Sequence, residues 1–218
     1  MPSASGSDAP DPGLAEQAAA LLACRIPEEA IGRLSAFEAL LAGRGADLGL
    51  VSKRDVSRLR QRHILDCLRA ASLVRASDTT AYDLGSGGGL PGLVVAIVVP
   101  DLRVACVESR RNRAAFLELA IDDLGLANAT VSLARIEDLE ERVDVCFSRA
   151  LAGPEESWRL AEPLLRPGGR LIYFAGRGSV PRGGAGEEGF PCPEGARIDL
   201  VPAPGLESAG PLVIMGRP

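Results

Sequence analysis

Short apolar runs rich in β-branched residues recur along the chain and alternate with helical patterns. The central runs lie at 79–84, 102–108, 129–134, 143–150 and 169–175. Each has the length and composition of a buried strand. Two intervening stretches, 110–126 and the one that starts at Pro154 and closes in Pro-Gly-Gly, carry apolar residues at helical spacing. Strands that alternate with helices form right-handed crossover units, so this region predicts a parallel sheet.

The two ends of the chain depart from this alternation. Residues 27–45 and about 53–73 have helical periodicity and predict the helices of an N-terminal cap. The glycine- and proline-rich stretch 177–195 predicts an exposed loop. Runs 196–203 and 211–218 have no helix between them and predict an antiparallel hairpin. The expected fold is α/β, with a mostly parallel seven-stranded sheet, an antiparallel C-terminal hairpin and an N-terminal helical cap.

Composition predicts one compact unit with a short tail. Residues 1–13 are rich in proline, serine and glycine and predict a disordered tail, 14–75 the cap and 76–218 the core. No apolar run approaches the ~20 residues that span a bilayer, and the N-terminus lacks the features of a secretory signal. Five cysteines without CxxC spacing argue against a zinc site. We expect a cytoplasmic protein without a metal, with buried thiols at Cys106 and Cys146.

The stretch "DLGSGGGLPG" at 83–92 follows the first predicted strand and precedes an apolar segment that predicts a helix. Open α/β sheets bind nucleotides at this place. Gly87, Gly89 and Gly92 match the dinucleotide pattern G-x-G-x-x-G, but the match is weak in a loop so rich in glycine. No lysine follows, which excludes the phosphate-binding loop of nucleotide hydrolases.

Two carboxylates indicate a ligand without phosphate. Asp83 ends the first strand and suits a ligand with a positive charge, whereas it would repel a pyrophosphate. Glu108 closes the second strand and suits the hydroxyls of a ribose, as it also would in an NAD site. Together they favour S-adenosylmethionine, which carries a sulfonium, an ammonium and a ribose. The alternative is a structural glycine turn with a surface glutamate.

The net charge of −5, from 24 basic and 29 acidic residues, argues against a general nucleic-acid binder. The distribution points the other way, because residues 53–62 and 110–113 are both rich in basic side chains. Arg110, Arg111 and Arg113 follow Ser109, a predicted N-cap, where the helix dipole disfavours positive charge. Charge at that place predicts contact with an anion such as RNA phosphate, with a solvated helix face as the alternative.

Five segments occur in the order and spacing of a known family: "RHILDCL" (62–68), "DLGSGGGLPG" (83–92), "VESRRNRAAFL" (107–117), "ARIED" (134–138) and "FSRALA" (147–152). Through them, residues 34–176 resemble the bacterial small-subunit ribosomal RNA methyltransferase G, or glucose-inhibited division protein B (GidB), family. The resemblance implies a Rossmann-like class I methyltransferase that transfers a methyl group from S-adenosylmethionine to N7 of a guanine in 16S ribosomal RNA, near the decoding centre. The implied partner is 16S ribosomal RNA or the 30S subunit, and we expect a monomer.

The resemblance also implies roles for individual residues. Gly85 and Leu90 would line the cofactor with Asp83 and Gly87 of the loop, Glu108 would bind its ribose, and Ile136 and Glu137 its adenine. Arg149 resembles the family arginine beside the cofactor and the target base, and is the expected catalytic residue through a hydrogen bond to guanine O6. A salt bridge to a local acid is the alternative for Arg149. The family commonly has Lys-Gly after the fifth strand, where this chain has Ala175-Gly176.

The segment "RHILD" resembles the family's cap signature, which borders the site, and Arg62, His63 and Asp66 are expected to contact RNA. The alternative for His63 is a core histidine, with Asp66 as its partner on the same helix face. Asp66 also has Arg62 and Arg69 within reach as ion-pair partners.

The expected chemistry needs few groups. Neutral guanine has a lone pair on N7, so catalysis rests mostly on proximity and alignment and requires no general base. Two other functions stay open from the sequence: a class I methyltransferase that acts on a small molecule or a protein, and a non-catalytic assembly factor that binds S-adenosylmethionine.

Overall fold

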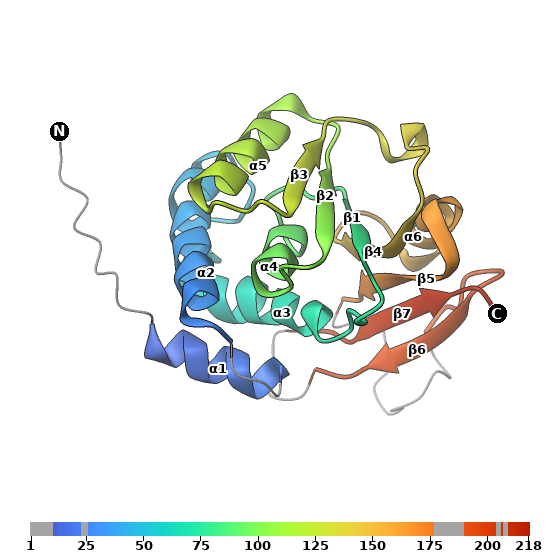
Figure 1. The fold of residues 1–218 in the computed structure, drawn as a ribbon, viewed down its shortest axis with the longest axis horizontal. Coiled ribbons are helices and arrows are strands. Elements are labelled where there is room, and N and C mark those ends of the chain that lie inside the picture. The colour runs from blue at the N-terminus through green and yellow to red at the C-terminus, as the bar shows by residue number, and fades with distance from the viewer. Residues whose placement is uncertain (1–10, 23–25, 177–189, 204–205, 207–208) are drawn as a thin grey trace.

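A computed structural model gives the fold, and the structure describes residues 11–22, 26–176, 190–203, 206 and 209–218. A seven-stranded sheet forms its centre in the order β3-β2-β1-β4-β5-β7-β6 (Figure 1). The strands are β1 (Thr80–Leu84), β2 (Arg103–Val107), β3 (Ala129–Ser132), β4 (Val143–Arg149), β5 (Leu165–Phe174), β6 (Arg197–Val201) and β7 (Leu212–Gly216). The neighbours among β1 to β5 are parallel, and β7 is antiparallel to both β5 and β6. The predicted sheet and its C-terminal hairpin are confirmed.

Helices flank the sheet and precede it. Those of the core are α4 (Gly92–Val98), α5 (Arg111–Asp123) and α6 (Pro154–Ala161), with the 3₁₀ turns η4 (Ile136–Asp138) and η5 (Glu162–Leu164). The N-terminal elements are α1 (Pro12–Leu22), α2 (Glu28–Leu40), η1 (Leu41–Gly45), η2 (Val56–Arg58), η3 (Arg60–Ile64) and α3 (Leu65–Ala71). We call the elements from α1 to α3 the cap.

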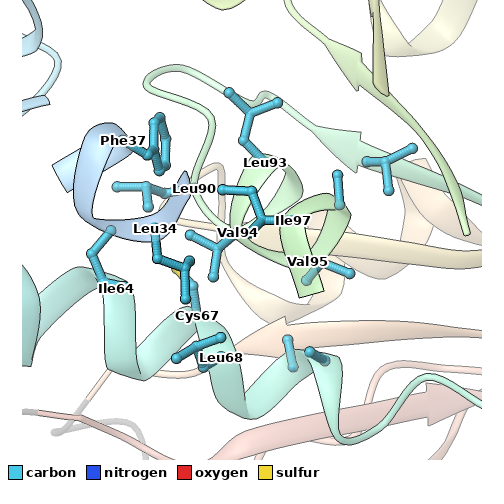
Figure 2. Packing of buried hydrophobic residues seen from close by; sticks show 14 of the residues in the cluster. Leu34, Phe37, Ile64, Cys67, Leu68, Leu90, Leu93, Val94, Val95 and Ile97 are labelled. Atoms are coloured by element: carbon cyan, nitrogen blue, oxygen red, sulfur yellow. The ribbon is translucent and has the colours of Figure 1, made fainter. Parts of the chain in front are cut away.

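The cap is part of the hydrophobic core. Leu34 and Phe37 of α2 and Leu68 of α3 are buried and gather around α4, whose Val94 and Ile97 face them (Figure 2). Packing of this kind stabilises the cap against the sheet by burying apolar surface, at roughly 25 cal/mol per Å². The cap is therefore held in a defined position beside the carboxyl end of β1.

Side chains of each strand alternate between the two faces of the sheet. On β4, Val145 and Phe147 belong to the apolar cluster shared with the cap and α4, whereas Cys146 belongs to the cluster with Trp158 of α6. Arg149 follows two residues after Phe147, so its side chain points to the face that the cap covers. This parity decides what the expected catalytic arginine contacts.

The predicted tail at 1–13 is wrong at its end, because α1 begins at Pro12. The Asp11 carboxylate accepts hydrogen bonds from the amides of Gly13 at 3.0 Å and Leu14 at 3.1 Å, which is the work of an N-cap. Residues 1–10 of that prediction lie outside the described residues, as do 177–189 of the predicted loop.

Two helix predictions also differ from the structure. The single helix expected at about 53–73 is divided into η2, η3 and α3. The helix expected to close at Pro167-Gly168-Gly169 ends instead at Ala161, and β5 already starts at Leu165. The Pro-Gly-Gly segment lies in β5 beside a shift in the β4–β5 register, and Gly168 has a φ of +78°. The segment forms an irregularity of the sheet. Proline and a glycine with positive φ occur at such irregularities as they do at helix ends.

Three of the cysteines behave as small apolar residues, whereas Cys192 is exposed. Cys67, Cys106 and Cys146 are buried free thiols, which confirms the prediction for the last two, and burial raises the pKa of each. Cys24 lies outside the described residues. No helix in the described part of the chain is long and apolar enough to cross a membrane.

Candidate cofactor and substrate site

The glycine loop runs from the end of β1 to the start of α4 through a backbone that only glycine adopts readily. Gly85, Gly87 and Gly89 have φ angles of +69°, +54° and +82°. A Cβ atom at Gly89 would lie 2.6 Å from Leu93 Cδ1, so space is closed there as well. The glycines therefore allow a tight loop, in which the amides of Ser86, Gly87 and Gly89 donate to Val107 O, Glu108 Oε2 and Ser86 O.

Asp83 braces this loop from below. Its Oδ2 accepts a hydrogen bond from the Gly92 amide at 3.0 Å, and only 1% of the residue is exposed. Burial raises the pKa of Asp83 to about 6. Asp83 is not among the residues that line the adjoining pocket. The carboxylate thus ties the two ends of the loop together from outside the lining, and its predicted contact with the cofactor stays a prediction.

A pocket of about 470 Å³ lies above the loop at the carboxyl ends of the strands. It is lined by Gly85, Val107, Glu108, Ser109, Arg110, Arg113, Ala134, Arg135, Ile136, Glu137, Ala150, Leu151 and Leu160. Ligands of open α/β sheets bind at this edge. A larger cavity of about 720 Å³ lies between α6 and residues 193–195, but its lining has none of the predicted site residues.

Glu108 joins the pocket to the loop. Its Oε2 accepts from the Gly87 amide at 3.1 Å, and its Oε1 accepts from the Arg110 amide at 2.9 Å. These bonds orient the carboxylate at the pocket wall, where it is 5% exposed. A carboxylate in this position has lone pairs left for a pair of hydroxyls.

The lining fits S-adenosylmethionine. Gly85, Glu108, Ile136 and Glu137, four residues predicted to hold this cofactor, line the same pocket. The carboxylates of Glu108 and Glu137 in this lining are acceptors for the hydroxyl and amino hydrogens of such a ligand. Leu90 is not in this lining: the residue is 8% exposed and packs in the core beside α2 (Figure 2), so its predicted contact with the cofactor stays a prediction.

Arg149 is held by the cap. Its Nη2 donates to the carbonyl oxygen of Arg62 at 3.2 Å and contacts His63 Nδ1 at 2.8 Å. Its Nε lies 3.7 Å from Asp66 Oδ2, and its guanidinium carbon lies 5.8 Å from the centre of the Phe174 ring. The structure therefore brings together the cap segment "RHILD" and the arginine of "FSRALA". No hydrogen bond from Nη1 is found among the described residues.

His63 is neutral in this arrangement. Burial and the nearby Arg149 charge lower its pKa to about 4. Because the guanidinium only donates, Nδ1 must accept, and the ring proton resides on Nε2. His63 Nε2 is buried and has no hydrogen-bond partner among the described residues. The structure places His63 against Arg149, and its predicted contact with RNA stays a prediction.

The other predicted RNA contacts fall into two groups. Arg62 forms an ion pair with Asp55 inside the cap, although 38% of its side chain is exposed. Arg110 and Arg111 are exposed, and Arg113 Nη1 lies 3.8 Å from Glu108 Oε2. The N-cap of α5 is Arg110 and not Ser109, so the helix begins one residue later than predicted.

Sequence reasoning missed the turn that follows β4. Ala150 has a φ of +56°, the only residue other than glycine with a positive φ in the described chain. The turn carries Leu151 over the loop, and a Cβ atom at Gly85 would lie 2.7 Å from Leu151 Cδ1. Alanine gives no signal for such a conformation, so the sequence alone does not reveal it.

Solved structures of methyltransferases share this fold. The chain matches a SAM-dependent methyltransferase from Aquifex aeolicus with a TM-score of 0.55 at 16% identity, over 75% of this chain and 95% of that one. It matches the S-adenosylmethionine-dependent methyltransferase SibL with a TM-score of 0.56 at 18% identity, over 74% and 55% of the two chains. At these identities the likeness shows the fold, which is the predicted Rossmann-like fold of class I methyltransferases.

Sequence relatives identify the family within this class of fold. Residues 30–181 match the GidB family model, described as rRNA small subunit methyltransferase G, and the chain belongs to this family. Proteins named Ribosomal RNA small subunit methyltransferase G from Mycolicibacterium gilvum (strain PYR-GCK) and Acidiphilium cryptum (strain JF-5) are 40% and 44% identical over 152 and 160 residues. These alignments cover 67% and 72% of this chain, and 66% and 73% of the relatives. The predicted family is confirmed, and with it S-adenosylmethionine as the cofactor.

Proposed function

We propose that the protein transfers a methyl group from S-adenosylmethionine to N7 of a guanine in 16S ribosomal RNA, near the decoding centre and in the bacterial cytoplasm. The observation that carries this proposal is the position of Arg149, fixed on one edge by the cap and without a described partner on Nη1. It stands one residue beyond the paired Leu84 and Ser148, beside the start of the glycine loop. Membership of the GidB family supports ribosomal RNA as the substrate.

The state of the nearby side chains favours N7 over a nucleophile that must first lose a proton. S-adenosylmethionine supplies an already activated methyl group when it is bound. His63 cannot serve as a base through Nδ1, because that nitrogen accepts from Arg149, and its pKa is lowered to about 4. Asp83, with a pKa raised to about 6, is occupied below the loop by the Gly92 amide. N7 of a neutral guanine needs neither group.

Arg149 has the geometry to orient a guanine. With Nη2 and Nε turned to the cap, the Nη1 edge is available to donate to O6, the acceptor next to N7 on the same base edge. This bond selects guanine over adenine, whose corresponding group donates. Alignment of the reacting atoms supplies the main rate enhancement, a contribution worth up to about 7–11 kcal/mol.

The arginines at the start of α5 suit the RNA backbone. Arg110 and Arg113 line the pocket, and Arg111 begins the helix beside them. No carboxylate within ion-pair distance of Arg110 or Arg111 is found among the described residues, and Arg113 has only the 3.8 Å contact with Glu108. We propose that these three side chains contact phosphates, while Arg62 contributes through its exposed part.

Mapping of 7-methylguanine in 16S ribosomal RNA tests the function. Purified protein and S-adenosylmethionine should methylate one guanine in 30S subunits from cells that lack the protein, and Arg149→Ala should reduce the rate by about 100-fold or more. The charge-preserving Arg149→Lys serves as the matched variant and should recover little, because lysine lacks the planar fork. Methylation of another atom would overturn the N7 assignment. Methylation of a small molecule or protein alone, or cofactor binding with no transfer, would favour the other two functions.

A further inference from the structure

Arg149 is the last residue of β4, but its guanidinium contacts residues of the cap. Both hydrogens of Nη2 are directed at one turn of the cap, to the carbonyl oxygen of Arg62 at 3.2 Å and to His63 Nδ1 at 2.8 Å. The side chain of Arg149 is 18% exposed, so these contacts compete little with water. The cap therefore fixes which edge of the guanidinium is left for a ligand.

The His63 contact is specific to one form of the ring. Only neutral His63 with its proton on Nε2 presents a lone pair on Nδ1 to Arg149. That form leaves the Nε2 hydrogen buried without an acceptor among the described residues, which has an energetic cost. A side chain with an acceptor at the position of Nδ1, and no buried donor at the position of Nε2, would avoid this cost. Packing alone therefore does not account for a histidine at position 63.

Asp66 supports Arg149 from a second direction. Its Oδ1 accepts from Arg69 Nη1 at 2.8 Å, and its Oδ2 lies 3.7 Å from Arg149 Nε. Arg69 is itself fixed, because it donates to the carbonyl oxygens of Val201 at 3.3 Å and Gly210 at 3.0 Å. The carboxylate is thus held between two arginines and cannot turn to solvent, with 8% of the residue exposed.

We propose that His63 and Asp66 are positioning residues for the methyl transfer, which hold the guanidinium of Arg149 so that its Nη1 edge meets the target guanine. They act through Arg149 and do not contact RNA. The inference rests on the proposed function of Arg149. A guanidinium freed from the cap would sample other rotamers, and a misplacement of about 1 Å at a reacting centre costs on the order of 100-fold in rate.

The kinetic test pairs two substitutions of one side chain. His63→Phe keeps a buried ring and removes the acceptor, so kcat should fall about 10- to 100-fold while the KM for 30S subunits and the Kd for S-adenosylmethionine stay within about threefold. His63→Asn places an amide oxygen near the position of Nδ1 and should recover most of the rate. A loss that appears in KM, with kcat unchanged, would mean that His63 touches RNA and would overturn the proposal.

A double-substitution cycle tests whether His63 acts through Arg149. In an Arg149→Ala background, His63→Phe should cost less than about twofold, because the group it positions is gone. A loss that persists at full size in that background would contradict the proposal. Asp66→Asn, which keeps an acceptor for Arg69 but lowers the attraction to Arg149, should show the same dependence on Arg149.

A spectroscopic readout keeps the inference testable apart from the reaction. His63 is the one histidine of the chain, so ¹⁵N-histidine labelling yields a single set of ring signals. The wild type should show Nε2 protonated and Nδ1 free at neutral pH, and Arg149→Ala should shift the tautomer balance and raise the histidine pKa. Unchanged signals would overturn the contact, even if His63→Phe fails to fold. If the methylated atom proves not to be guanine N7, the proposed function fails, while the coupling can still be measured on the product that forms.

Discussion

The Asp83 carboxylate accepts a hydrogen bond from the Gly92 amide at 3.0 Å and is 1% exposed, so one buried acid links the residue before the loop to the residue that starts α4. The tight approach leaves no space between them, because a Cβ atom on Gly92 would lie 2.6 Å from Asp83 Oδ2. The loop that shapes the cofactor pocket is therefore held by a contact outside the pocket.

Burial makes the protonation of Asp83 depend on pH near neutrality, although the Gly92 hydrogen bond opposes the shift. The pKa of Asp83 in the folded state is about 6, above its ordinary value of 3.8, so the folded protein binds the proton more tightly. The favourable contribution is present below pH 3.8 and is lost as pH rises through 6. Relative to the wild type, Asp83→Asn should gain up to about 3 kcal/mol in free energy of unfolding between pH 4 and pH 8. Urea unfolding across this range measures the difference, and parallel curves for the two proteins would contradict it.

Gly92→Ala should destabilise the protein by about 2 kcal/mol or more, because the new methyl group collides with a buried carboxylate on rigid backbone. Gly32→Ala is the control: Gly32 lies within α2 and a Cβ atom there meets nothing within 4 Å. That substitution should stabilise by about 0.5–1 kcal/mol through helix propensity. Thermal unfolding of both variants gives the comparison, and effects of the same sign would disprove the steric account.

Glu108 should be needed for cofactor affinity. Its two oxygens each accept from a backbone amide, so Glu108→Gln directs an amide hydrogen at Gly87 or Arg110 and loosens the pocket wall. We expect the Kd for S-adenosylmethionine to rise about 10- to 100-fold, as for a lost charge-assisted hydrogen bond. Glu118→Gln, at an exposed position of α5 outside the lining, should change it less than threefold. Calorimetric titration decides, and equal effects would refute a special role for Glu108.

The turn after β4 should gain stability from glycine. Ala150 has a φ of +56°, and an alanine in this left-handed region costs roughly 1 kcal/mol that glycine does not. Ala150→Gly should therefore raise the free energy of unfolding by about 0.5–1 kcal/mol, whereas Ala152→Gly, two residues later and without a positive φ, should lower it. Chemical denaturation provides both values, and a loss of stability in Ala150→Gly would count against the strain.

Acid should weaken the cap through His63. The folded pKa of about 4 lies below the ordinary value of 6.5, so the unfolded chain binds the proton more tightly between these values. The stability linked to neutral His63 is present above pH 6.5 and is lost as pH falls through 4, by at most about 3 kcal/mol and less where water reaches the ring. His63→Asn lacks the titration, so its stability relative to the wild type should rise on acidification. No relative gain between pH 6.5 and pH 4 would refute the depressed pKa.

Much of the core follows from the sequence because its signals are local. β-Branched runs and the alternation of strands and helices place β1 to β5, and the glycine density of the loop allows few other conformations. The end of α6 does not follow, because Pro167-Gly168-Gly169 fits both a helix stop and a sheet irregularity, and only pairing with β4 decides between them. The start of α1 could be predicted from the sequence, because Asp11 before Pro12 is an N-cap signal.

The site shows the same division. The family pattern predicted four cofactor residues that the strand order places in one pocket: Gly85, Glu108, Ile136 and Glu137. The contacts of Asp83 and His63 could not be predicted from the sequence. They depend on which face of the sheet a strand residue occupies and on how the cap lies across that face. In the structure the Asp83 carboxylate accepts from the Gly92 amide, and His63 contacts Arg149.

Arg69 gives these contacts a consequence for the order of assembly. Its donations to Val201, Pro202 and Gly210 join residues 132, 133 and 141 positions apart in sequence. Contacts across such separations close large loops and form late in folding. Arg69, which holds Asp66 beside Arg149, thus acquires these partners only after β6 and β7 have been synthesised and paired. A C-terminally truncated protein is therefore expected to keep the cofactor loop but to lose this support of Arg149.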